Sequence, residues 1–283
     1  SGKHIRVGKP MQRPITIPRW IAKQNVFTVE DIHLLQLINR EDPGGTVWSC
    51  GDLDKIVTLD DCISILGGSS ISNSVIDAYG YLISKKSFNL SNIKSCFFSA
   101  NCLQYIRGPS LALRHSFINE RFHLALGTHR YMLFPLNSGG HHWTLLVLDI
   151  SDWEYRFYNS KKPRRSNCFD QYINAAIEMK EYVDKLLMEC SMMHRKRQTL
   201  PCLTAPVTPQ QLHGSLDCGI IICHLMEQIA LEQPVGESVN HDEVLKYRAM
   251  MLHDLLNDKD HSWTEDGFQK KLMLRKRRKP IVL

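Results

Sequence analysis

Three apolar segments in the middle of the chain have the length and spacing of β-strands. They cover residues 131–136, 143–149 and 154–159. The pair Gly139-Gly140 separates the first two segments, and Ser151-Asp152 lies before the third. Short apolar runs bounded by glycine and small polar residues are typical of strands joined by turns. The pattern therefore predicts neighbouring strands that pair in antiparallel fashion.

Around these strands, apolar residues recur at the spacing of amphipathic helices. The clearest case is the segment 169–190, which reads as a long amphipathic helix carrying Ile173, Ile177, Tyr182 and Leu186. The other predicted elements are helices over 29–38, 70–85 and 241–257, a helix start at 58–61, helices with loops over 90–125, a strand at 203–207 and a helix that begins near Cys218. Together they predict an α+β architecture, with helices packed on an antiparallel sheet.

Length and composition favour one large folded unit. With 283 residues, 43% of them hydrophobic, the chain is long enough to bury a sizeable core, which we expect within residues 51–260. Residues 1–50 are interrupted by prolines and glycines, and we expect an extension that lies on this domain. Residues 261–283 are expected to form a C-terminal tail. No apolar run approaches the roughly 18 residues that a membrane-spanning helix needs, so we do not expect a membrane protein.

The cysteines are numerous but follow no regular spacing. There are nine, and no two form a Cys-x-x-Cys pair. An odd number of scattered cysteines argues against both a disulfide framework and a zinc site. A reducing compartment is the natural setting for such a chain, and it would keep a nucleophilic thiol usable. The positions are Cys50, Cys62, Cys96, Cys102, Cys168, Cys190, Cys202, Cys218 and Cys223.

The formal net charge of +6 is concentrated near the C-terminus, whereas the rest of the chain is close to neutral. Such a run is typical of a nuclear address, of a nucleic-acid contact or of a solvated chain end. We expect a nuclear address, with a cytoplasmic share and a nucleic-acid contact both left open. The basic residues concerned are Lys270, Lys271, Arg275, Lys276, Arg277, Arg278 and Lys279.

The step Asp217-Cys218-Gly219, followed by an apolar run over 220–225, has the pattern of a nucleophile site. A thiol at a helix N-terminus faces unpaired backbone N–H groups and the positive end of the helix dipole, and both favour the thiolate. A cysteine before an apolar run is, however, more often a buried core residue. The interpretation therefore depends on partner residues elsewhere in the chain.

The candidate partners lie on the predicted strands. His142 and Trp143 begin the second strand, and Asn159 ends the third. Antiparallel pairing would bring the end of the third strand back toward His142. Asn159 would then accept a hydrogen bond from one ring nitrogen of His142, which would fix the tautomer and leave the other nitrogen facing the sulfur.

These motifs, His142-Trp143, Tyr158-Asn159-Ser160, Gln211 and Asp217-Cys218-Gly219, resemble in type and order the ubiquitin-like-protein-specific protease family, which includes the SUMO-specific proteases. Two upstream segments extend the resemblance. Residues 71–83 are similar to the first substrate-facing helix of the family, and residues 97–103 are similar to its next element. The resemblance covers about residues 55–232.

The resemblance implies a papain-like or adenain-like cysteine protease fold, with residues 51–260 as the catalytic domain. It implies that Cys218 is the nucleophile, His142 the base and Asn159 its orienter, with Gln211 in the oxyanion hole and Gln210 in reserve. It also implies cleavage after the Gly-Gly terminus of a ubiquitin-like modifier, and we expect that modifier to be SUMO. The enzyme is expected to be a monomer and to need no metal or organic cofactor. The substrate-facing candidates are Trp143, Ser70 and Asn73.

Three positions depart from the family pattern. Asn159 stands where most relatives carry Asp, Gln211 lies one residue further from the cysteine than usual, and Ser70 replaces a frequent Trp. These departures leave open a pseudo-protease that binds a modifier without cleaving it. An acyltransferase with a similar Cys-His arrangement is a further alternative. For the cysteine protease, we expect an Asp in place of Asn159 to hold His142 at least as well and to raise its pKa.

Overall fold

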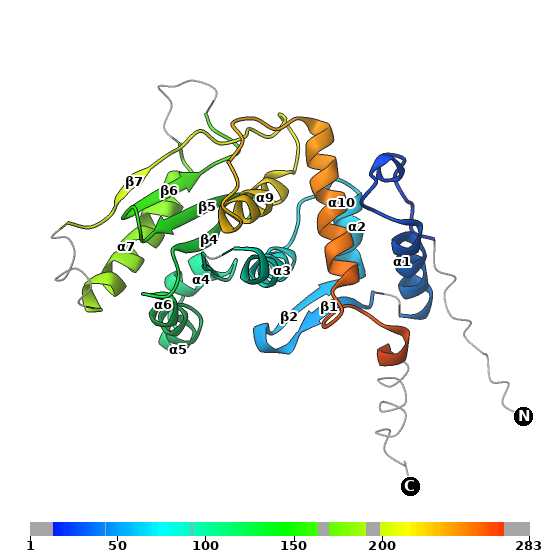
Figure 1. The fold of residues 1–283 in the computed structure, drawn as a ribbon, viewed down its shortest axis with the longest axis horizontal. Helices are drawn as coiled ribbons and strands as arrows, with labels where there is room; N and C mark the ends of the chain where they lie inside the picture. The colour runs from blue at the N-terminus through cyan, green and yellow to red at the C-terminus, as the bar shows by residue number, and fades with distance from the viewer. Residues whose placement is uncertain (1–13, 43, 92, 164–169, 191–198, 269–283) are drawn as a thin grey trace, which may run out of the picture.

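The computed structural model describes residues 14–42, 44–91, 93–163, 170–190 and 199–268 (Figure 1). The basic run at residues 270–279 lies outside these ranges, and so do the expectations of a nuclear address and of a nucleic-acid contact that depend on it. Within the described ranges, no helix is long and apolar enough to span a membrane.

The described residues form a main sheet of five strands in the order β3-β4-β5-β6-β7. The predicted antiparallel pairing is confirmed for β4, β5 and β6, whereas the short edge strands β3 and β7 pair in parallel with β4 and β6. β3 lies in a segment for which only helices and loops were predicted, because three residues are too few to show strand alternation. The strands are β3 (Ser95–Phe97), β4 (Tyr131–Ser138), β5 (His142–Asp149), β6 (Glu154–Tyr158) and β7 (Cys202–Thr204).

The helices follow the predicted segments closely. Thr28, Thr58 and Asn240 cap α1, α2 and α10 with reciprocal capping boxes, which satisfy N–H groups at the helix starts. The helices are α1 (Val29–Glu41), α2 (Leu59–Leu66), α3 (Asn73–Leu90), α4 (Cys102–Arg107), α5 (Leu111–Arg114), α6 (Glu120–Ala125), α7 (Ile173–Glu189), α9 (Cys218–Ala230) and α10 (His241–Asn257); a second, two-stranded sheet pairs β1 (Thr46–Cys50) with β2 (Lys55–Thr58).

The main sheet separates two hydrophobic cores. Helix α7 covers one face, and α3 and α9 cover the other (Figure 1). Both faces of β4 and β5 are therefore buried, which explains why these strands are continuous apolar runs instead of alternating ones. Leu133, Leu145 and Val147 point into the core of α3 and α9, and Met132, Leu146 and Leu148 point into the core of α7.

The segment before residue 50 shares the core of α3 and α9. Leu35 and Ile38 of α1 are fully buried there. Asp31 of α1 accepts hydrogen bonds from His253 (2.8 Å) and Asn257 (2.7 Å) of α10. β1 also pairs with β2 across the expected boundary at residue 50. Apolar packing and buried polar contacts therefore bind residues 29–50 to the rest of the domain.

A buried arginine joins three parts of the fold. Arg248 of α10 has 0% exposure, and its guanidinium donates to Asp217 Oδ1 from Nε (3.1 Å) and Nη2 (2.6 Å). Its Nη1 donates to the backbone oxygens of Ile65 and Ser69 at 3.1 Å each. Since Asp217 directly precedes Cys218, this contact fixes the start of α9 against α10 and the end of α2.

Replacing Arg248 should therefore destabilise the whole domain. We expect Arg248→Met to lower the free energy of unfolding by about 3–5 kcal/mol, because the buried Asp217 carboxylate would lose its charged partner. Urea denaturation measures this change. The matched control is Lys246→Met, at an exposed position of the same helix, which should stay within about 0.5 kcal/mol of the unsubstituted protein. Equal unfolding midpoints for both variants would contradict the role given to Arg248.

Candidate active site

Cys218 is the first residue of α9, so the predicted helix start is confirmed. Its side chain is almost fully covered, with 3% exposure. Burial raises the pKa of the thiol, while the backbone N–H groups of Trp143, Gly219 and Cys218 itself lower it. The net direction is upward, so the expected preference for thiolate at the helix N-terminus is wrong for the free protein. The thiol is neutral at rest and needs a base.

That base lies at the start of β5. His142 Nε2 is 2.7 Å from Asn159 Oδ1, at the residue after β6. The antiparallel pairing of β5 with β6 brings these two ends together, as the strand pattern implies. The pair is buried, since His142 has 2% and Asn159 0% exposure. A hydrogen bond that is shielded from water in this way holds the imidazole ring in one orientation.

The other partners of Asn159 fix the tautomer of His142. Asn159 Oδ1 accepts from the Lys161 N–H (2.9 Å), and Nδ2 donates to Asp170 Oδ2 (2.8 Å) and to the Lys161 carbonyl oxygen (3.3 Å). A backbone N–H only donates and a carboxylate only accepts, so the orientation of the amide is determined. Because Oδ1 faces the ring, Nε2 of neutral His142 carries the proton, and Nδ1 is left as the proton acceptor.

Asp170 and Tyr172 were not predicted as site residues. Both lie just before α7, and the Tyr172 ring is 4.3 Å from the His142 ring, centroid to centroid. Neither belongs to a motif, and the sequence before them gives no periodic signal. Only the packing of α7 against the sheet places them at the site.

Two glutamines before Cys218 differ in their free donors. Both Nε2 hydrogens of Gln210 are used by carbonyl oxygens, those of Asn159 (2.9 Å) and Thr208 (2.8 Å). Gln211 Nε2 donates to the Ser215 carbonyl oxygen (2.8 Å), which leaves its second hydrogen without a partner among the described residues. Gln211 therefore remains a candidate donor to a substrate oxygen. Gln210 has no hydrogen left for that role.

A turn accommodates the additional residue between Gln211 and Cys218. The Ser215 N–H donates to the Leu212 carbonyl oxygen (3.0 Å), and Gly214 has a φ of +81°. A left-handed residue closes such a turn at little cost when it is glycine. The Gln211 backbone N–H and side chain stay bonded to Ser160, next to Asn159 (2.9 and 3.1 Å).

Comparison with protein families matches residues 125–259 to the C-terminal catalytic domain of the Ulp1 protease family. This segment includes Cys218, His142, Asn159 and Gln211. Within residues 125–259, the chain matches a cysteine protease domain of the Ulp1 family. The predicted family is thus confirmed, while the role of each residue stays a prediction. No curated protein matched the sequence.

Solved Ulp1-family structures share the α+β fold. The C-terminal Ulp1 protease domain in complex with SMT3, the yeast ortholog of SUMO, has a TM-score of 0.63 at 15% identity and covers 82% of this chain and 96% of its own. The SUMO protease Ulp1 with its catalytic cysteine oxidised to a sulfonic acid has a TM-score of 0.62 at 15% identity, and the match covers 82% of this chain and 96% of that one. The Chaetomium thermophilum Ulp1-like SUMO protease catalytic domain has a TM-score of 0.56 at 14% identity, and the match covers 87% of this chain and 94% of that one.

The predicted substrate-facing residues lie around the start of α3. Trp143 is buried and donates from Nε1 to the Ile71 carbonyl oxygen (3.3 Å). Ser70 is exposed on one side of Ile71, and Asn73, which donates to Asn101, is half-buried on the other. A Cβ added to Gly219 would lie only 2.5 Å from Ile71 Cγ1, so the start of α9 is packed tightly against Ile71 and Trp143.

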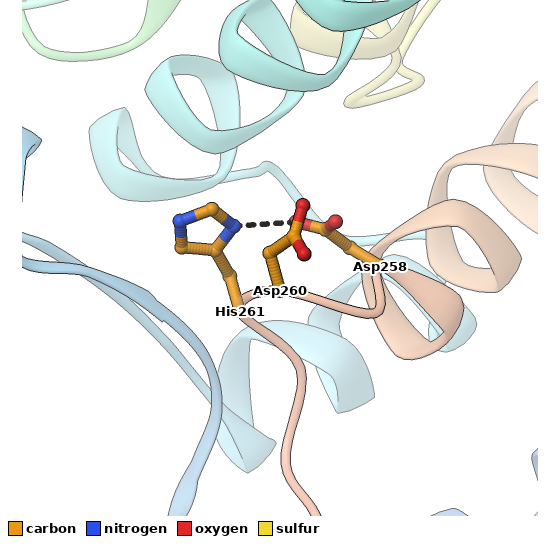
Figure 2. A group of neighbouring side chains, drawn as sticks. All are labelled: Asp258, Asp260 and His261. Carbon is orange, nitrogen blue, oxygen red and sulfur yellow. Dashed lines mark hydrogen bonds and ion pairs between the residues drawn. The ribbon is translucent and has the colours of Figure 1, made fainter.

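Three potential metal ligands lie close together beyond α10, but their oxygens already have partners. Asp258 and His261 point toward each other beside Asp260 (Figure 2). Lys85 Nζ donates to Asp258 Oδ1 (2.7 Å) and Asp260 Oδ2 (2.6 Å). Asp258 Oδ2 accepts from Trp48 Nε1 and His261 Nδ1, both at 2.9 Å. The Lys85 ammonium takes the place of a cation, so we interpret this group as a structural junction between α3, β1 and the end of α10.

The charges around His142 act in opposite directions. Burial lowers its pKa most strongly, the hydrogen bond with Asn159 raises it, the positive charge of Lys161 lowers it, and the negative charge of Asp170 raises it. The net direction is below the usual value of 6.5. His142 is therefore a neutral base at neutral pH, which suits the neutral thiol of Cys218.

Removing the charge of Lys161 should shift the pH dependence of activity. Lys161 lowers the pKa of both His142 and Cys218. In Lys161→Met the pKa of His142 should rise, so the base becomes protonated at a higher pH as the solution is acidified. The acid limb of kcat/KM should then move to higher pH, and the shift should shrink at high salt, because Lys161 is exposed. Lys162→Met is the neighbouring control, and identical shifts in both variants would refute the assignment.

Proposed function

We propose that this protease cleaves the bond after the Gly-Gly terminus of a ubiquitin-like modifier and that SUMO is its substrate. The observation that carries the proposal is the buried His142–Asn159 pair at 2.7 Å. The thiol of Cys218, which begins a helix, lies at the backbone N–H of Trp143, the residue next to His142. The solved relatives named above, which include a complex with SMT3 and a SUMO protease, support the choice of modifier.

Each residue has a proposed role in acyl transfer. Cys218 Sγ attacks the carbonyl carbon while His142 Nδ1 takes the thiol proton, and the imidazolium returns that proton to the leaving amine. Asn159 holds His142 in the Nε2–H tautomer. Gln211 and the Cys218 N–H stabilise the oxyanion. Water then hydrolyses the thioester, with His142 again acting as the base. These steps need no metal or organic cofactor.

The tight packing around the nucleophile supports a glycine-ended substrate. Cys218 and His142 have only 3% and 2% exposure, and Ile71 and Trp143 crowd the start of α9. A chain terminus without side chains is the thinnest peptide that could reach such a thiol. Trp143, Ser70 and Asn73 are the residues that we propose to line its path.

A binding-only function remains the second candidate, since Asn159, Ser70 and the shifted Gln211 depart from the family pattern. The amide of Asn159 nevertheless keeps the hydrogen bond to His142, and the turn at Gly214 keeps Gln211 beside Ser160. Both observations favour the protease. An acyltransferase would be recognised by release of acetyl from acetyl-coenzyme A.

A panel of modifiers that end in an electrophile tests the proposal, with the products read by mass. We expect covalent capture of the SUMO probe by the unsubstituted protein and by Cys202→Ala, which removes an exposed thiol. Cys218→Ala should lose capture completely and keep its affinity for the modifier, because the thiol is small. Capture by Cys218→Ala would refute the nucleophile. Capture of another modifier alone would refute SUMO, and tight binding without capture would favour the binding-only candidate.

Nuclear localisation is proposed on the basic run 270–279 alone. Deleting residues 270–283 should lower the nuclear share of a tagged protein and leave peptidase activity intact, because the site lies within residues 142–218. Fluorescence microscopy and a cleavage assay measure the two effects. A truncated protein that stays nuclear would show that the address lies elsewhere.

A further inference from the structure

We propose that Asp170 is a positioning residue, which supplies the negative charge of the catalytic group through the amide of Asn159. The proposal rests on the roles proposed above for His142 and Asn159. The hydrogen bonds run in one direction, from His142 Nε2–H to Asn159 Oδ1 (2.7 Å) and from Asn159 Nδ2–H to Asp170 Oδ2 (2.8 Å). The Asp170 carboxylate therefore contacts His142 indirectly, through the side chain of Asn159, and does not take the place of Asn159.

The backbone holds Asp170 in this position independently of Asn159. Asp170 Oδ1 accepts from the Tyr172 N–H (3.0 Å), and the Asp170 carbonyl oxygen accepts from the Ile173 N–H (3.1 Å) at the start of α7. The positive end of the helix dipole of α7 also favours a negative charge there. Asp170 is thus a fixed acceptor whose second oxygen points at the amide of Asn159.

This carboxylate changes the electrostatics of the base. Among the described residues, the titratable or charged groups that face His142 are Lys161 after β6 and Asp170 and Tyr172 before α7, with the Cys218 thiol at the backbone N–H of the neighbouring Trp143. Lys161 disfavours the imidazolium and Asp170 favours it. Since His142 must become positive when it takes the thiol proton, Asp170 stabilises the state that the reaction passes through.

The geometry also explains why position 159 carries an amide. An aspartate there would bring two carboxylates to hydrogen-bond distance, and like charges so close raise the pKa of one of them strongly. The expectation that Asn159→Asp holds His142 at least as well therefore applies only while one of the two carboxyl groups keeps its proton. Of the two side chains, the amide accepts from His142 and donates to Asp170 at every pH.

The test exchanges the two side chains. Asp170→Asn keeps an acceptor for the Tyr172 N–H, because Asn and Asp cap helices equally well, but it removes the charge. Asn159→Asp creates the repelling pair. The double variant, Asn159→Asp with Asp170→Asn, restores an accepting group at 159 and a donating group at 170. Glu181→Gln removes one exposed charge from the same helix and is the control.

We expect Asp170→Asn to lower kcat roughly 10- to 100-fold, by analogy with metal-ligating histidines, for which losing the partner that orients the ring typically costs that much. KM should stay unchanged, and the acid limb of kcat/KM should move to lower pH, because the pKa of His142 falls. Asn159→Asp should lose activity as the pH rises and its second carboxyl group ionises. The double variant should recover most of the rate and lose that alkaline decline. Glu181→Gln should match the unsubstituted protein.

Unchanged kcat and pH dependence in Asp170→Asn would overturn the proposal, and so would a double variant no better than Asn159→Asp. The pKa of His142, measured by NMR in a Cys218→Ala background, gives a readout that needs no catalysis. A protein that cleaves no modifier would refute the proposed function, and the NMR titration would still decide the role of Asp170. An unchanged His142 pKa in Asp170→Asn would refute it.

Discussion

The start of α9 depends on the buried guanidinium of Arg248. One fully buried side chain bonds to the Asp217 carboxylate, to the Ile65 carbonyl oxygen near the end of α2 and to the Ser69 carbonyl oxygen just after that helix. A charge so deeply buried is tolerated only when its partner and its donors are satisfied together. The contact therefore stabilises one arrangement of α10, α2 and the nucleophile helix, and any shift of Asp217 would also move Cys218.

The sheet brings the other half of the site to this fixed point. β5 is buried on both faces, so its start can shift neither toward α9 nor toward α7 without opening one of the two cores. His142 consequently has its backbone set by strand pairing and its ring set by Asn159. Cys218 comes from one side of the sheet and Asp170 from the segment that leads into α7 on the other. The candidate site lies where the two layers meet.

Features with a local signal could be predicted from the sequence. The strands β4, β5 and β6 show as apolar runs between turns, and their antiparallel pairing implied the approach of Asn159 to His142. The helix start at Cys218 followed from the apolar run after it. Asp170, Arg248 and the neutral state of the thiol could not be predicted. The first two act through contacts between elements that the pattern does not relate, and the third depends on how much water the finished fold excludes.

The covered, protonated state of Cys218 also bears on how this protease withstands its surroundings. Oxidants and small alkylating agents react with thiolates, and they need access to the sulfur. With 3% exposure and a pKa raised by burial, the resting sulfur offers neither. The same burial that raises the pKa of the thiol therefore also limits the access of such reagents to the sulfur.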